Sequence, residues 1–148
     1  MRLGLLIAIG VMAPLLLGCG PIVMLPGGAL SGDVTPNPTN WEFTEEVDTF
    51  QLETRPSDPY SVNIWAIAIE DTMYIVAGGG PDTTWASHIK DDPQVRLRVG
   101  DALYELTAVE SNTNSERDLF LAAAKKKYDF DPDGEDTAKA VLYRLKPR

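Results

Sequence analysis

The sequence contains one histidine, His88, and one cysteine, Cys19, so few side chains can supply nitrogen or sulfur chemistry. His88 could donate a proton or ligate haem or a metal, because a neutral imidazole does either near neutral pH. The simpler interpretation packs it on a helix face beside Trp85 and Ile89. A zinc site needs three or four nitrogen or sulfur ligands, which a lone histidine cannot provide. No Ser/His/Asp arrangement stands out, so the sequence predicts no catalytic residue.

An acidic loop near the C-terminus is the other group of residues that could do chemistry. Asp129, Asp131 and Asp133 alternate along it, and Gly134 comes next. In an EF-hand loop, positions 1, 3 and 5 supply calcium ligands and a glycine at position 6 permits the turn. The glutamate required at position 12 is absent, and Glu135 or Asp136 would have to replace it as a ligand. Two interpretations remain: a weak Ca²⁺ site formed by Asp129, Asp131, Asp133 and Glu135, or a solvated acidic turn.

Cys19 closes an apolar N-terminal run in the context Leu16-Leu17-Gly18-Cys19. This context resembles the lipobox of bacterial lipoproteins, which implies that residues 1–18 are cleaved and that Cys19 then carries lipid. The run is shorter than the roughly 20 apolar residues of a membrane-spanning helix, and Pro14 interrupts it, as expected of a cleaved signal segment. We therefore expect a lipid-anchored protein of the bacterial cell envelope. Gly20 in place of aspartate favours the periplasmic face of the outer membrane over the inner membrane.

Composition divides the rest of the chain into a tether and one domain. Residues 19–40 are rich in glycine, proline, serine and threonine, which predicts a flexible tether behind the lipidated cysteine. Residues 41–148 have the size of a single domain, and with Cys19 consumed by lipid that domain has no disulfide. The formal net charge of the chain is −9. Such a charge repels phosphate backbones and argues against a nucleic-acid partner.

Hydrophobic periodicity predicts a mainly β domain with two helices, of the α+β class. Phe50 and Leu52 alternate with polar residues, as in a half-buried strand. Residues 62–69 are apolar on both faces and predict a central strand with Trp65 in the core. Ser115-Glu116-Arg117-Asp118 resembles a capping box at the start of the second helix. The inward face of that helix would be Phe120, Ala123, Ala124 and Tyr128. The predicted strands are 47–54, 62–69, 73–77, 95–99, 102–110 and 141–145, and the predicted helices are a short one around 85–89 and a longer one over 115–128.

The order of these elements points to a known family. The residues that carry the resemblance are Trp85, His88, Asp92-Pro93-Gln94-Val95-Arg96-Leu97, Gly100 and Tyr104. This pattern resembles the split β-barrel flavin-binding superfamily, in particular deazaflavin-dependent nitroreductases and pyridoxamine-phosphate-oxidase-like domains. The resemblance covers roughly residues 47–145. It implies a small antiparallel split β-barrel of about six strands.

Members of this superfamily bind FMN or a deazaflavin in a groove, often at a homodimer interface. The resemblance therefore implies a set of candidate cofactor-binding residues and a possible homodimer. Asp58 adds a negative charge beside the turn where the family has Arg/Lys-Ser-Gly, which counts against a phosphate there. The Gly-rich loop before the short helix could approach a phosphate closely. The candidate residues are Arg55 and Ser57 from the turn, Gly78, Gly79 and Gly80 from the loop, and Trp85 and His88 from the short helix.

The sequence supports three functions of different classes. The favoured one is a non-catalytic envelope lipoprotein whose small barrel binds a protein partner or a small ligand, because the phosphate-binding residues of the family are incomplete. The second is a flavin- or deazaflavin-dependent oxidoreductase. The third is a structural module stabilised by Ca²⁺.

Overall fold

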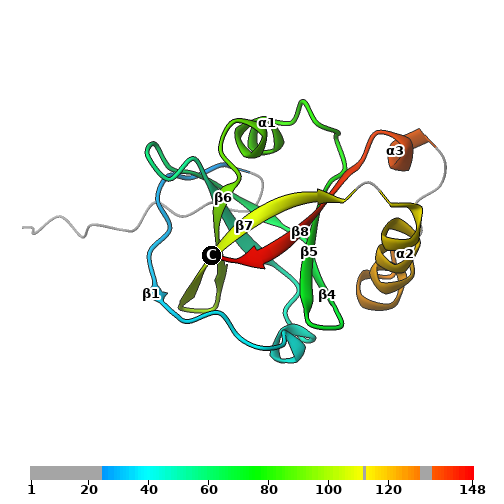
Figure 1. Cartoon of the computed structure of the whole chain (residues 1–148), viewed down its shortest axis with the longest axis horizontal. Helices are drawn as coiled ribbons and strands as arrows, with labels where there is room; N and C mark the ends of the chain where they lie inside the picture. Colours follow the sequence, from blue (N-terminus) through cyan, green and yellow to red (C-terminus); the bar gives the residue numbers. More distant parts are fainter. Residues whose placement is uncertain (1–24, 112, 131–134) are drawn as a thin grey trace, which may run out of the picture.

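The computed structural model describes residues 25–111, 113–130 and 135–148, in which a largely antiparallel sheet curls into a barrel (Figure 1). Helix α1 lies over one end of the barrel and α2 lies beside it. The strands are β1 (Asp33–Val34), β2 (Phe50–Thr54), β3 (Tyr60–Ile64), β4 (Ala66–Ile69), β5 (Thr72–Ala77), β6 (Gln94–Val99), β7 (Ala102–Ser111) and β8 (Val141–Pro147). The helices are the 3-10 turn η1 (Glu42–Thr44), α1 (Thr84–Asp91), α2 (Asn114–Tyr128) and α3 (Glu135–Ala138).

The barrel closes because one stretch of chain forms both edges of the sheet. The strands follow the order β3-β2-β6-β7-β8-β5-β4, with β3 paired to β2 and β4 paired to β5. Strand β3 ends at Ile64 and β4 begins at Ala66, so only Trp65 separates them. When β3 and β4 are counted as one bent strand, six strands surround the core. This arrangement confirms the predicted antiparallel split β-barrel.

Alternation along the strands fills the barrel interior. Phe50 and Leu52 of β2 are fully buried and Gln51 between them is partly exposed, as predicted from their spacing. Removing such a side chain from water stabilises a fold by about 1.5–3 kcal/mol. The neighbouring strands add the buried side chains Met73, Ile75, Val95, Leu97 and Leu106. The interior of the barrel is therefore the main core of the domain.

The bend at Trp65 also fixes the position of α2. The Trp65 side chain is 45% exposed, so the prediction of one uninterrupted strand with a core tryptophan is wrong at this residue. The bend turns the indole outward, where it stacks on Tyr128 with ring centroids 4.8 Å apart and an interplanar angle of 11°. The Tyr128 hydroxyl donates to the Ala66 carbonyl at 3.0 Å. This bond supplies a partner to a backbone group at the strand break, where ladder pairing is interrupted.

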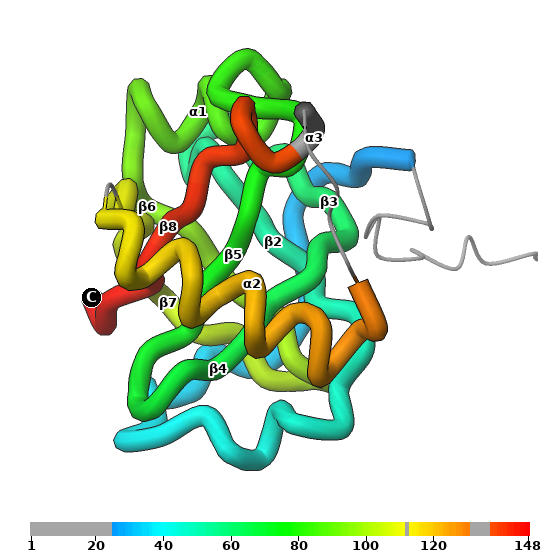
Figure 2. The backbone as a smooth tube through the Cα atoms, turned by 90° about the vertical axis from the view of Figure 1, so that its right-hand side faces the viewer, coloured from blue at the N-terminus to red at the C-terminus, as the bar shows by residue number. Residues whose placement is uncertain are grey.

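Helix α2 crosses the outside of β4 and β5 (Figure 2). Phe120 and Ala124 are buried, and Ala123 and Tyr128 are partly buried beside them, which confirms the predicted inward face. This face forms a second core with side chains of three strands, Ile67 of β4, Tyr74 of β5 and Leu142 of β8. The second core holds the helix against the barrel wall.

The start of α2 differs by two residues from the prediction. Thr113, not Ser115, is the N-cap, and its hydroxyl accepts a hydrogen bond from the Glu116 N–H at 3.3 Å. The Glu116 carboxylate in turn accepts from the hydroxyls of Ser111 at 2.6 Å and Thr113 at 2.7 Å. A capping box joins residues three apart. The glutamate therefore pairs with the threonine before it, not with the adjacent serine.

Residues 27–40, called the strap below, run along the barrel. Gly27 and Ser61 exchange two backbone hydrogen bonds of 2.8 Å each, and β1 pairs in parallel with the start of β7. Leu30 is 5% exposed, and its N–H donates to the buried carboxylate of Glu53 at 2.6 Å. The expected flexible tether therefore does not extend to residue 40. The folded domain begins near Gly27, before the predicted boundary at residue 41.

We expect Glu116→Gln to reduce stability and to weaken its pH dependence. Hydrogen bonds from Ser111 and Thr113 lower the pKa of Glu116 to about 2. A carboxyl with a lowered folded pKa stabilises the fold above its unfolded pKa, and this contribution disappears as the pH falls through the folded value. Urea denaturation of wild type and variant at about pH 7, 4 and 2.5 should therefore show curves that converge with falling pH. Glu110→Gln serves as the matched control, and an identical pH profile for wild type and Glu116→Gln would contradict the expectation.

We expect Tyr128→Phe to lower stability by about 1 kcal/mol, because it removes one partly buried hydrogen bond but keeps the stacked ring. The melting temperature should fall by about 3–5 °C for a domain of this size. Tyr143→Phe is the control, because it makes the same change at another buried tyrosine whose ring contacts Trp85. Equal shifts for the two variants would show that the bond to Ala66 contributes nothing.

Candidate ligand-binding groove

A groove of about 560 Å³ lies on the outside of the barrel at the bend between β3 and β4. It extends between α1, α2 and the segment that leads from α3 into β8. Its volume falls in the range of small-molecule sites in proteins, roughly 300–1,000 Å³. The described residues that line it are mostly apolar or aromatic: Asn63, Ile64, Trp65, Val76, Gly78, Gly79, Trp85, Arg117, Phe120, Leu121, Phe130, Thr137, Ala140 and Leu142.

Aromatic side chains form one wall of the groove. Trp65 stands between Tyr128, on which it stacks, and Phe130, which meets it edge-on with centroids 5.3 Å apart at 72°. Trp65 is 45% and Phe130 38% exposed. Trp85 of α1 also lines the groove and leans on Tyr143 with centroids 5.9 Å apart. Exposed aromatic faces held in place by their neighbours offer a flat apolar ligand a rigid stacking partner.

The loop after β5 supplies a second part of the wall through its backbone. A Cβ atom added to Gly78 would meet nothing within 4 Å, so the groove is open at this residue. A Cβ on Gly79 would come within 2.7 Å of the Thr83 methyl group. Gly80 has a φ of +91° and faces the Lys139 carbonyl, so its role is to form the turn. Gly78 and Gly79 line the groove, whereas Gly80 does not.

Arg117 is the only charged side chain among the described lining residues, and sequence reasoning missed it as a site residue. Its guanidinium donates to the carbonyls of Thr137 at 3.1 Å and Ala140 at 3.2 Å. In the sequence, Arg117 lies within the predicted capping box Ser115-Glu116-Arg117-Asp118. A signal was present, because Arg117, Phe120 and Leu121 follow the i, i+3, i+4 spacing of one helix face.

The remaining predicted cofactor residues lie outside the groove, on the β2–β3 side of α1. His88 Nδ1 is 3.0 Å from the Thr54 hydroxyl, and the ring of Tyr60 meets the imidazole edge-on. Burial lowers the pKa of His88, and the charge of Arg55 lowers it further. Arg55 itself forms an ion pair with Asp58 at 3.0 Å, in the turn that contains Ser57. The structure thus brings Gly78, Gly79 and Trp85 together, and it places Arg55, Ser57 and His88 elsewhere.

The predicted calcium loop and the lipid site fall largely outside the described residues. Asp131, Asp133 and Cys19 belong to segments that are not described, and the side chain of Glu135 is not described either. Asp129 ends α2 in the left-handed conformation with a φ of +52°. Within the described part of the chain, no cluster of three or more His, Cys, Asp or Glu side chains could hold a metal ion. Among the described helices, none is long and apolar enough to cross a bilayer.

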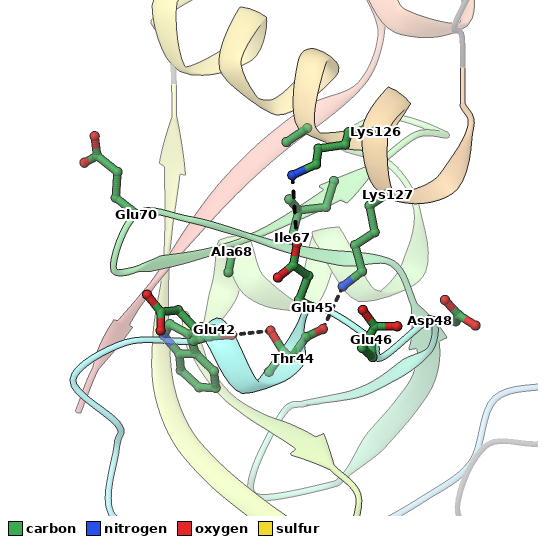
Figure 3. A pocket seen from close by; sticks show the side chains of 12 residues that line it. Glu42, Thr44, Glu45, Glu46, Asp48, Ile67, Ala68, Glu70, Lys126 and Lys127 are labelled. Atoms are coloured by element: carbon green, nitrogen blue, oxygen red, sulfur yellow. Dashed lines mark hydrogen bonds and ion pairs between the residues drawn. The ribbon is translucent and has the colours of Figure 1, made fainter.

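A second hollow, of about 510 Å³, separates α2 from η1 and has an acidic rim (Figure 3). Lys127 points down into it from α2 and donates to the Thr44 carbonyl at 3.0 Å. Its amine also lies 4.9 Å from the ring centre of Phe50. Burial lowers the pKa of Lys127, while Asp48 and Glu45 act in the opposite direction. The lysine therefore fastens the helix to the barrel, and we take the aromatic groove as the candidate site.

Comparison with known proteins identifies the fold. No family model and no curated protein sequence matches the chain, but solved structures do. A candidate pyridoxamine 5′-phosphate oxidase from Listeria innocua is 17% identical, with a TM-score of 0.57 over 70% of this chain and 86% of that one. The haem storage protein HutZ from Vibrio cholerae is 18% identical, with a TM-score of 0.58 over 72% and 86%. An F420-H2-dependent reductase is 20% identical, with a TM-score of 0.54 over 68% and 95%.

These identities are low, so the matches establish the fold and leave the ligand open. The chain has the split-barrel fold of these proteins, which confirms the fold that the sequence resemblance implied.

Proposed function

We propose that this chain is a split-barrel binding protein whose groove holds the planar ring of a flavin or deazaflavin. The observation that carries the proposal is the half-exposed indole of Trp65, fixed by stacking at the wall of a groove of about 560 Å³. The fold supports it, since one solved structure with this fold is an F420-H2-dependent reductase.

The groove suits a ring in shape and chemistry. Offset stacking between aromatic rings contributes about 0.5–1.5 kcal/mol beyond the burial of apolar area. Gly78 leaves open space beside the wall, and Trp85 offers a second aromatic surface. Because Trp65 is already held by Tyr128 and Phe130, little ordering of side chains is needed when a ligand enters.

The residues of the groove support binding more directly than catalysis. Among its described lining residues, only Arg117 has an ionisable side chain. A guanidinium group does not lose its proton near neutral pH. General acid–base catalysis needs a group whose pKa lies near the working pH. A bound flavin would supply electron or hydride transfer from its own ring. The role of the chain would be to hold the ring and to shield one of its faces from water.

We also propose that the protein is anchored to the envelope by lipid on Cys19. The support is the sequence context Leu16-Leu17-Gly18-Cys19 after an uncharged apolar run. Several acyl chains on one residue give stable anchoring, at about 0.8 kcal/mol for each buried CH₂ group. In this arrangement the groove would face the envelope compartment. A homodimer or a protein partner in the envelope remains part of the proposal.

We expect the full-length protein to bind FMN, riboflavin or a deazaflavin, and Gly78→Leu to weaken binding at least tenfold by filling the groove. A ligand that binds only the folded state at 100 times its Kd adds about 2.7 kcal/mol of stability, or roughly 5–10 °C in melting temperature. Thermal melting and quenching of tryptophan fluorescence measure both effects. Gly28→Ala, on the strap, is the control with unchanged binding. The absence of any shift or quenching with all three compounds would refute the proposal.

We expect Cys19→Ser to abolish incorporation of labelled palmitate and to release the protein from the membrane fraction. The thiol is the attachment point of the lipid, and a hydroxyl does not replace it in this modification. Labelling followed by fractionation measures both effects, with Ser31→Ala as a control that stays labelled. Equal labelling of wild type and Cys19→Ser would rule out this anchor.

A further inference from the structure

Arg117 stands apart from the other arginines that the structure describes. The chain has a formal net charge of −9, with 22 acidic and 13 basic residues. In the described ranges, each of the other arginines lies within 4.0 Å of a carboxylate. These pairs are Arg55 with Asp58, Arg96 with Glu53, Arg98 with Asp101, Arg144 with Glu116 and Arg148 with Glu105. Over the same ranges, Arg117 has no carboxylate at that distance and bonds only to carbonyl oxygens.

The two carbonyl bonds orient the guanidinium without neutralising it. The Thr137 and Ala140 carbonyls lie 3.1 and 3.2 Å from its two terminal nitrogens and carry no net charge. A guanidinium has five N–H donors in a planar fork, so donors remain for a further partner. Arg117 lines the same groove as the exposed Trp65. The groove therefore combines a fixed positive charge with an aromatic wall.

Among the described residues no carboxylate balances the charge of Arg117, so an anionic group of a ligand would find an available partner there. Guanidinium groups bind phosphate and carboxylate oxygens with short, charge-assisted hydrogen bonds. The groove offers a single such cation among its described residues, so it matches one anionic group better than several. The surrounding negative charge disfavours ligands that carry many charges.

We propose that Arg117 binds the anionic group of the ligand, and that the ligand is a planar ring with one oxyanionic substituent. This inference rests on the proposed function. It adds the charged substituent of the ligand, which the aromatic wall does not select. The ring lies against Trp65, and the oxyanion accepts hydrogen bonds from the free donors of Arg117. Selection then has two components, stacking for the ring and charge for its substituent.

The test compares FMN with riboflavin, which has the same ring and lacks the phosphate. We expect the full-length protein to bind FMN about 10- to 100-fold more tightly, as one charge-assisted hydrogen-bonded contact provides. Arg117→Met should weaken the binding of FMN much more than that of riboflavin and so bring the two Kd values close together. Arg117→Lys should keep part of the preference. Because charge provides the difference, added salt should reduce it in the wild type.

Arg148→Met is the matched control, because it removes the same charge at an exposed site paired with Glu105. It should leave the ratio of the two Kd values unchanged. Thermal melting without ligand checks that each variant folds. If Arg117→Met does not fold, the ratio of the Kd values of the wild type for FMN and riboflavin tests the inference alone. Equal affinity of the wild type for FMN and riboflavin would overturn the role of Arg117 and leave the proposed function standing. Failure of both compounds to bind would refute the proposed function itself.

Discussion

The fold depends on one constraint, that a single strand must serve both edges of the sheet. An edge strand exposes unpaired backbone groups, and closing the barrel removes that exposure. The strand can pair with β2 in its first half and β5 in its second only if it bends between them, and the bend falls at Trp65. The same bend turns the indole outward and leaves the Ala66 carbonyl to α2. Barrel closure, helix docking and the groove wall are therefore consequences of one local feature.

A second organising feature is the way an acidic chain places its few cations. Glu53 is 2% exposed and receives two hydrogen bonds from Arg96, at 2.7 Å each, and one from the Leu30 N–H. A buried ion pair contributes little net stability, but an unmatched buried charge is costly. The strap must therefore cross the barrel where its N–H reaches Glu53. Lys127 is a second cation that joins two segments: its amine donates to the Thr44 carbonyl and so holds α2 near η1.

Local hydrophobic patterns in the sequence predicted the strands and helices. The strand break at Trp65 and the pairing of the strap depend on contacts between residues distant in sequence, which such patterns do not contain. Alternation at Phe50 and Leu52 and spacing at Phe120 and Ala124 gave the correct buried faces, because each follows from the period of its own element. The break at Trp65 was missed because a run of apolar residues contains no polar residue to mark it. The composition of the strap suggested a free tether, and only its pairing with Ser61 and β7 shows otherwise. Four of the seven predicted cofactor residues lie outside the groove: Gly80 forms the turn, and Arg55, Ser57 and His88 lie on the β2–β3 side of α1.

The groove also has a physical reason to be a binding site and not an accident of packing. An exposed tryptophan and phenylalanine side by side are a liability for a protein in water, because apolar patches attract non-specific partners. Trp65 is nevertheless held in its exposed position by contacts with the rings of Tyr128 and Phe130. It also keeps Gly78 beside it, where a Cβ atom would meet nothing. Rigidity and open space together lower the entropic cost of taking up a flat ligand. Because Tyr128 fixes both Trp65 and the Ala66 carbonyl, a ligand stacked on Trp65 would also stabilise the closed barrel.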